Sequence, residues 1–267
     1  MMRMSDSRLR SIFILSFIIL FINLSCVLAI SPTGANVTSV SNSTTSPDTP
    51  QSHAAVAGNV SELNLVGYSV TQSWQGYYGN VSGTIQLADS SDNILYNWSL
   101  ASPEGEIYAS INSTVSWTNV QCFNYTASGT FASDAGNAGG ISQFGMNLTM
   151  LEGNYSIALE DVDGVNETFT LSGAGTHDNF YTNNLNFSEG ECSNTRVYSD
   201  NGVGVNNEFE EALLYDPLGR NVIFTSILDE NVLGYDGAAH DFEMLVLEDG
   251  HGSNTTTTTY YFYVEIQ

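Results

Sequence analysis

The sequence predicts an all-β protein, an antiparallel β-sandwich that is either one large sandwich or two small ones linked by a disulfide. Short runs alternate apolar and polar residues, as strands with one buried face do. Sequences rich in Gly, Asn and Asp separate these runs, as turns would. No segment keeps a 3.6-residue apolar period between helix caps, so helices should be minor.

The N-terminus predicts export. A basic stretch, Met1–Arg10, precedes an apolar one, Ile12–Leu24, and the small-residue sequence Val27–Ala29 comes next. This order is typical of a secretory signal peptide covering residues 1–29. Two alternatives are an uncleaved N-terminal anchor, which needs roughly 20 apolar residues to span a bilayer, and a lipidated Cys26. The expected location is extracellular or on the cell surface.

Residues 30–57 predict a flexible stalk, because they are rich in Ser, Thr and Pro and lack apolar periodicity. The β-sandwich region is expected over residues 58–267. The Gly- and Ala-rich residues 128–145 offer an internal domain boundary or a long loop.

The clearest hairpin pattern lies within residues 69–100. Ile85 and Leu87 precede the polar turn Asp89–Asn93, and Tyr96 and Trp98 come after it at matching positions. We therefore expect these side chains to form one buried face.

Further strands are expected along the rest of the chain, and residues 222–224 are apolar on both faces, as a central strand would be. These strands are expected near residues 63–70, 107–117, 120–125, 146–150, 155–159, 169–171, 185–187, 209–215, 221–228, 241–247 and 256–266.

The charge excludes some partners. The chain has a formal net charge of −24, and beyond residue 29 its only basic residues besides histidine are Arg196 and Arg220. Such a surface cannot neutralise phosphates, so we expect neither nucleic acid nor an anionic membrane as a partner. Other envelope proteins, a second copy of the chain or surface glycans are the expected partners. The chain would contact a membrane only through an uncleaved N-terminal segment.

Cys122 and Cys192 remain after removal of the signal. An even pair in an exported chain predicts a disulfide. The alternative, free thiols or a redox site, has no CxxC motif and no nearby basic residue to support it.

N-glycosylation is predicted at many positions. Those between Asn80 and Asn186 are expected in or beside strands, opposite the apolar side chains, as a glycan requires. The twelve sequons are Asn36, Asn42, Asn59, Asn80, Asn97, Asn112, Asn124, Asn147, Asn154, Asn166, Asn186 and Asn254.

No cofactor is expected, and Ca²⁺ is the one metal with a candidate site. Asp161 and Asp163 place carboxylates at alternate positions before Gly164, although a plain acidic turn explains the same pattern. His240 and His251 resemble a metal pair, but they bracket a strand and would lie over about 25 Å apart.

The sequence offers no support for an enzyme. It lacks G-x-S-x-G and any recognisable nucleophile–histidine pattern. Acidic pairs such as Glu104/Glu106, Glu189/Glu191 and Glu210/Glu211 would suit a glycoside hydrolase only inside a cleft, and so acidic a composition produces such pairs by chance.

Three stretches, SWQGYYGNVSGTI, LYNWSLASPEGEIYAS and HDFEMLVLEDGHGSNTTTTTYYFYVEIQ, resemble secreted, glycosylated, β-rich archaeal surface proteins with no assigned activity. The resemblance extends over most of the chain from Gly67 and implies an archaeal envelope or extracellular setting.

We therefore expect an extracellular or envelope glycoprotein with a structural or adhesive role, a role compatible with self-assembly at the surface. Its C-terminal strand could add to a neighbour's sheet. The alternative is a module that binds glycans or proteins through loops near residues 74–78.

Overall fold

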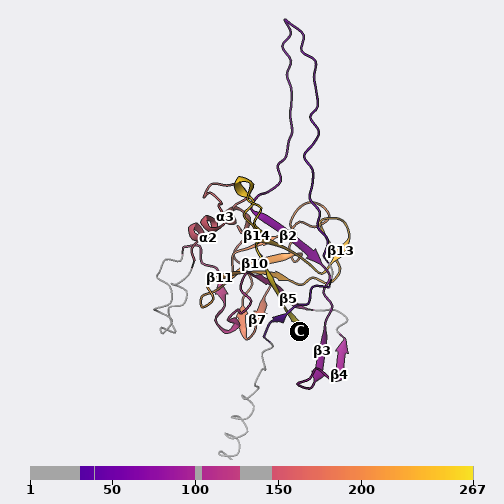
Figure 1. Ribbon diagram of the computed structural model, residues 1–267, viewed down its shortest axis with the longest axis vertical. Coiled ribbons are helices and arrows are strands. Elements are labelled where there is room, and N and C mark those ends of the chain that lie inside the picture. Colours follow the sequence, from indigo (N-terminus) through magenta and orange to yellow (C-terminus); the bar gives the residue numbers. More distant parts are fainter. Residues whose placement is uncertain (1–30, 39, 100–103, 127–145, 267) are drawn as a thin grey trace, which may run out of the picture. The chain divides into compact units, whose positions relative to one another are not determined.

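The fold, seen in a computed structural model, is a seven-stranded antiparallel sheet on which smaller sheets and short helices pack (Figure 1). The structure describes residues 31–38, 40–99, 104–126 and 146–266. Strands predominate and only two α-helices occur in these residues, which confirms the predicted all-β antiparallel sandwich. The expected signal (1–29) and internal boundary (128–145) lie outside the described residues.

The elements in chain order are β1 (Thr33–Gly34), β2 (Trp74–Gly79), β3 (Thr84–Ala88), β4 (Ile94–Ser99), β5 (Gly105–Ser110), η1 (Trp117–Asn119), β6 (Gln121–Cys122), α2 (Leu148–Asn154), α3 (Val165–Thr168), β7 (Phe180–Thr182), β8 (Leu185–Phe187), β9 (Asn194–Arg196), β10 (Glu210–Asp216), β11 (Asn221–Ile227), β12 (Val232–Leu233), β13 (Ala239–His240), β14 (Phe242–Leu247), η3 (His251–Ser253) and β15 (Tyr261–Ile266).

The large sheet has the strand order β1-β15-β5-β11-β10-β6, and β9 also pairs with β10. All residues of β10 and the middle five of β11 are buried. The prediction of a central strand covered on both faces is thus confirmed for residues 222–224. The C-terminal strand β15 lies between β1 and β5, so it is not a free strand available to a neighbour.

The first face of this sheet carries the larger core. Leu213 of β10 and Phe224 of β11 pack against Met244 of β14, and α2 and α3 contribute Leu151 and Val165 to the same cluster. This is the interior of the sandwich, with the β2–β14 pair as its second layer.

Strand β14 is held to the large sheet by side chains. Its Leu245 N–H donates to Glu211 Oε2 at 2.8 Å, and its Glu243 carbonyl accepts from Ser226 Oγ at 2.9 Å. Buried backbone groups need hydrogen-bond partners. For the groups of β14 that face the large sheet, polar side chains of β10 and β11 are these partners.

The second face is covered by the β7–β8 hairpin and by η1. Phe180 and Phe187 stack with ring centroids 5.0 Å apart, and Trp117 lies against Tyr108 and Tyr263. Cys122, in the edge strand β6, forms the predicted disulfide with Cys192 across a sequence separation of 70 residues.

Several predicted strands are absent from the described residues. Residues 148–154 form helix α2 because Asn147 caps it, accepting from Met150 N at 2.9 Å, and Leu148 and Leu151 face the core at helical spacing. Residues 155–159 and 169–170 form turns and loops, Leu171 makes only an isolated bridge, and β5 ends at Ser110.

The segment between β1 and β2 contains no helix or strand in its described residues, although a strand was expected near residues 63–70. Nearly all of its side chains are exposed, and Figure 1 draws it as a long extended excursion. Conversely, Thr33 and Gly34, which were assigned to the stalk, pair with β15. Among the described residues, no helix is long and apolar enough to cross a bilayer.

Candidate functional site

The β3–β4 hairpin is built around a tightly bonded turn. Asp89 Oδ1 accepts from Ser91 N at 2.8 Å and from Asn93 N at 3.0 Å, and Asp92 adopts a left-handed φ of 61°. These bonds to Asn93 and Ser91 lower the pKa of the exposed Asp89 carboxyl. The local sequence therefore specifies the turn without help from the rest of the fold.

The register separates the hairpin into two unlike faces. Ile85 lies opposite Trp98 and Leu87 opposite Tyr96, whereas Gln86 lies opposite the sequon residue Asn97. The rings of Tyr96 and Trp98 are 4.9 Å apart. The hairpin and its alternation, as predicted, are therefore present.

The prediction that this apolar face is buried is wrong. Ile85, Leu87, Ile94, Tyr96 and Trp98 are each 44–59 % exposed. In the described part of the chain, β3 and β4 pair only with one another, so each leaves an edge without a strand partner. A two-stranded hairpin of this kind is marginal in water by itself, and an exposed apolar face marks an interaction surface.

The root of the hairpin is held firmly to the core. Val81 N donates to Asp241 Oδ2 at 2.8 Å, and the same carboxylate accepts from Asn231 N at 3.1 Å. A Cβ on Gly83 would meet the end of the Ile266 side chain, so the chain passes close to the end of β15 at this position. The apolar face is thus presented from a fixed base.

A second cluster, on the second face of the large sheet, consists of buried carboxyls. Glu106 and Glu265 lie directly opposite each other on β5 and β15, and both are almost fully buried. Glu106 Oε1 accepts from Tyr181 N at 3.3 Å, and Glu265 Oε2 accepts from Asn183 N at 2.9 Å and from the Tyr108 hydroxyl at 3.2 Å. Sequence reasoning missed this pair, because the two residues stand over 150 positions apart and each resembles a solvent-facing acid.

Burial and the charge of Glu265 raise the pKa of Glu106 to about 8, and burial raises the pKa of Glu265 to about 7. Like charges at opposed positions cannot both ionise cheaply, so at least one is protonated at neutral pH. A glycoside hydrolase needs its two carboxyls in a cleft open to substrate. This pair is shielded by β7, and its geometry is that of a structural contact.

The adjacent acids Glu210 and Glu211, which would suit a glycoside hydrolase only inside a cleft, are not brought together on β10. Glu210 faces β9, where it pairs with Arg196, whereas Glu211 faces β14 on the other side of the sheet. On β5, Glu106 is buried, and Glu104 just before it is exposed. Strand alternation is the reason on β10, because neighbouring residues point to opposite faces.

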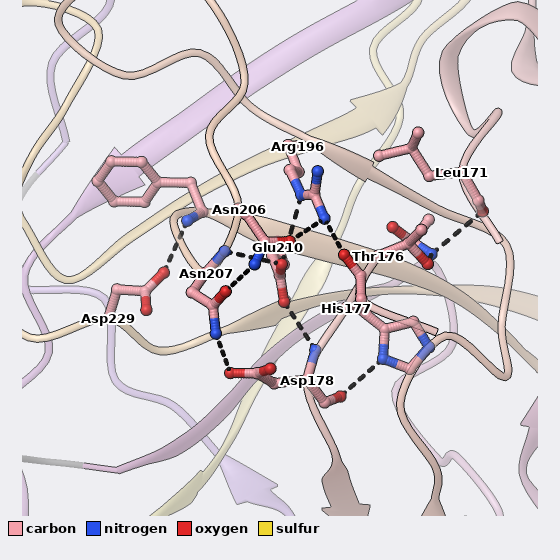
Figure 2. Close-up of polar contacts among 12 residues, drawn as sticks. Leu171, Thr176, His177, Asp178, Arg196, Asn206, Asn207, Glu210 and Asp229 are labelled. Atoms are coloured by element: carbon pink, nitrogen blue, oxygen red, sulfur yellow. Dashed lines mark hydrogen bonds and ion pairs between the residues drawn. The ribbon is translucent and has the colours of Figure 1, made fainter. Parts of the chain in front are cut away.

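Glu210 is the centre of a polar network that joins several loops (Figure 2). It accepts from Asp178 N at 2.7 Å, from Asn207 N at 3.0 Å and from Arg196 Nε at 3.4 Å. Arg196 also donates to the Gly175 carbonyl. One of the chain's few cationic side chains is thus used to hold loops together.

The calcium interpretation of Asp161 and Asp163 gains no support. Asp161 Oδ2 accepts from Ala158 N at 2.7 Å, and Asp163 Oδ2 accepts from Thr71 Oγ1 at 2.5 Å. Over the described ranges, no three His, Cys, Asp or Glu side chains are grouped so that they could hold a metal ion.

His240 and His177 have hydrogen-bond partners within the described chain. His240 Nε2 lies 3.0 Å from Asp236 Oδ1 in β13 and its turn, and His251 lies beyond the far end of β14. His177 is buried, and its Nε2 accepts from Cys192 N at 3.1 Å, so its Nδ1 carries the proton.

The expected binding loop at residues 74–78 is strand β2. Trp74 packs on Phe224 within the core, and Tyr77 packs on Phe262. Of the aromatic side chains of β2, only Tyr78 points outward, with its ring 5.1 Å from that of Tyr235.

The sequons lie at accessible positions. None of the twelve asparagines is buried, and only Asn112 and Asn147 are half-buried. Only Asn97 and Asn186 lie within strands of the described chain, in β4 and β8, so the strand-face argument applies to two sites. Glycosylation itself stays a prediction.

No family model, no curated protein and no solved structure matches this chain. The function is therefore inferred from the geometry of the hairpin and of the buried clusters.

Proposed function

We propose that the protein is an extracellular or cell-envelope glycoprotein with a structural or adhesive role, and that the β3–β4 hairpin is its contact element. The observation that carries the proposal is the exposed apolar face of Ile85, Leu87, Tyr96 and Trp98 on a firmly held root. Monomeric surfaces rarely keep such a face without a partner.

Two other observations support an extracellular setting. The Cys122–Cys192 disulfide is typical of exported chains, and the sequon asparagines are accessible to glycan transfer. The charge-poor hairpin also stands out in a strongly anionic chain, because its strands β3 and β4 contain no charged residue. The resemblance to archaeal surface proteins points in the same direction.

The test compares two hairpin faces in cells that export the protein. Trp98→Asp should release the protein from the envelope fraction into the medium. Gln86→Asp, on the opposite face of the same hairpin, should leave its distribution unchanged. Equal retention of the two variants would contradict the proposal.

A second candidate function is glycan binding at Tyr78 and Tyr235. Their rings form a half-exposed T-shaped pair beside His240, and the hydrogen bond with Tyr78 raises the pKa of Tyr235 to about 12. Aromatic rings with polar tips are common at binding surfaces. A glycan array should show binding that Tyr235→Ala removes and Tyr198→Ala, another exposed tyrosine, retains.

A further inference from the structure

Residues 65–71 are a second exposed apolar element without a strand partner in the described chain. Side chains alone hold it, since the Tyr68 hydroxyl donates to the Ser46 carbonyl at 2.7 Å and Thr71 Oγ1 donates to Asp163 Oδ2 at 2.5 Å. Val66, Tyr68 and Val70 alternate with Gly67, Ser69 and Thr71, and these three apolar side chains are 42–99 % exposed. In the described part of the chain, none of residues 60–71 makes a backbone–backbone hydrogen bond. An extended segment with this alternation and without backbone–backbone bonds is what a sheet edge accepts.

The dimensions of this segment match the hairpin. Seven extended residues span about 23 Å, and β3 and β4 have five and six residues respectively. Both hairpin strands offer backbone groups along one edge, and Val66, Tyr68 and Val70 would extend the apolar face of Ile85–Trp98. The hairpin offers a strand edge without a partner, and residues 65–71 offer an extended segment that could pair with it.

The two elements do not pair with one another in the described chain, where they leave β2 from opposite ends. Before β2, the Gln72 carbonyl is fixed by Gly250 N at 2.8 Å. After β2, Val81 is fixed to Asp241. The six residues of β2 separate these points by roughly 20 Å.

We propose, building on the function proposed for the hairpin, that residues 65–71 of one copy add as a β-strand to the β3–β4 hairpin of a second copy. The charge distribution favours this occupant. Residues 63–73 and both hairpin strands contain no charged side chain, although the chain has a net charge of −24. Two copies can therefore meet here without apposing their acids.

The contact is head-to-tail, because donor and acceptor are different surfaces at opposite ends of β2. A heterologous contact of this kind leaves one donor and one acceptor free after each addition. The products are linear chains or closed rings, the smallest of which is a pair in which each copy donates to the other.

The test is complementation between two variants of the full exported chain, with assembly measured by analytical ultracentrifugation. Wild type should form oligomers whose mean mass rises with concentration. Tyr68→Asp/Val70→Asp, which lacks a donor, and Leu87→Asp/Trp98→Asp, which lacks an acceptor, should each be monomeric. Mixed one to one, they should form dimers and nothing longer, since each keeps one working half.

Two controls separate assembly from misfolding. Val203→Asp, an exposed apolar site outside both elements, should oligomerise like wild type. A synthetic peptide of residues 63–73 should shorten wild-type oligomers without any mutation.

A wild type that stays monomeric at every concentration, or a mixture that forms no dimer, overturns strand donation. If Trp98→Asp still leaves the envelope fraction in that case, the hairpin binds a different molecule and only this inference fails. If the variants alter neither the oligomeric state nor the retention in the envelope fraction, the proposed function fails as well.

Discussion

The interior and the β3–β4 hairpin place side chains in opposite ways. Glu106, Glu211 and Glu265 are buried without a cationic partner among the described ion pairs, whereas Tyr96 and Trp98 lie half exposed. A buried charge is costly unless it is paired or neutralised, and the core avoids this cost by holding protonated carboxyls. Protonation cannot lower the cost of exposing the apolar side chains of the hairpin to water, because these side chains do not titrate. The fold itself stabilises the buried acids by keeping them protonated. The exposed apolar face of the hairpin can be covered only by a partner.

The largest effect should come from removing the carboxyl that holds β14. Glu211→Ala leaves Leu245 N–H buried without an acceptor and opens a cavity, so the free energy of unfolding should fall by about 3 kcal/mol at pH 5. Urea unfolding measures it.

Glu211→Gln is the matched control, because its amide oxygen can accept the same hydrogen bond. Burial raises the pKa of Glu211 well above its usual range, which favours the neutral carboxyl. The Gln variant should stay within about 1 kcal/mol of wild type. If Glu211→Gln lowered the free energy of unfolding as much as Glu211→Ala does, the carboxyl proton would itself be required for stability.

A smaller effect should appear as a pH dependence. Burial raises the pKa of Glu106 to about 8, that of Glu265 to about 7 and that of Asp229 to about 6. Between pH 4.5 and 8 the folded chain therefore holds protons that the unfolded chain has released. Stability should be greatest at the acidic end of this window and fall as pH rises, by at most about 1.4 kcal/mol per pH unit for each group.

The measurement is the urea midpoint from pH 5 to pH 8. Glu106→Gln/Glu265→Gln should flatten the fall, and Glu104→Gln, on an exposed neighbour, should not. Stability that rises across the window would contradict the assignment of neutral carboxyls. Below about pH 4 the trend should reverse, because hydrogen bonds from Asn93 and Ser91 lower the pKa of Asp89.

The smallest effect should come from the hairpin. Trp98→Ser removes an apolar side chain that the monomer leaves half exposed, so the unfolding free energy of the monomer should change by no more than about 0.5 kcal/mol. A loss of about 2 kcal/mol or more, measured at a concentration below any assembly, would show that this face packs within its own chain.

Short-range features of this fold could be read from the sequence, and long-range ones could not. The Asp89–Asn93 turn is specified by its own residues, and the Ile85–Trp98 register results from alternation. Cys122 and Cys192 are the only cysteines left once residues 1–29 are removed, so their pairing could be predicted by counting.

Which faces are covered depends on contacts between distant strands. Glu265 alternates with apolar residues and so resembles a solvent-facing acid, yet the β7–β8 hairpin covers it through Asn183. For the same reason the exposure of the hairpin face could not be predicted. Alternation shows that a hairpin has an apolar face, but not whether anything packs on it. An acid surrounded by apolar residues, as in the FEEALLY stretch, is the available signal of a neutral buried carboxyl.

The position of β2 has a mechanical consequence. A pull between residue 71 and Gly83 would pass along β2, whose six residues pair with β14 by hydrogen bonds that lie across the direction of the pull. Because the two points of the pull flank the same strand, the covalent backbone of the already extended β2 would carry the load, and the hydrogen bonds to β14 would not be sheared. The Cys122–Cys192 bond lies outside this load path, so reduction of the disulfide should leave the extensibility of this connection unaltered.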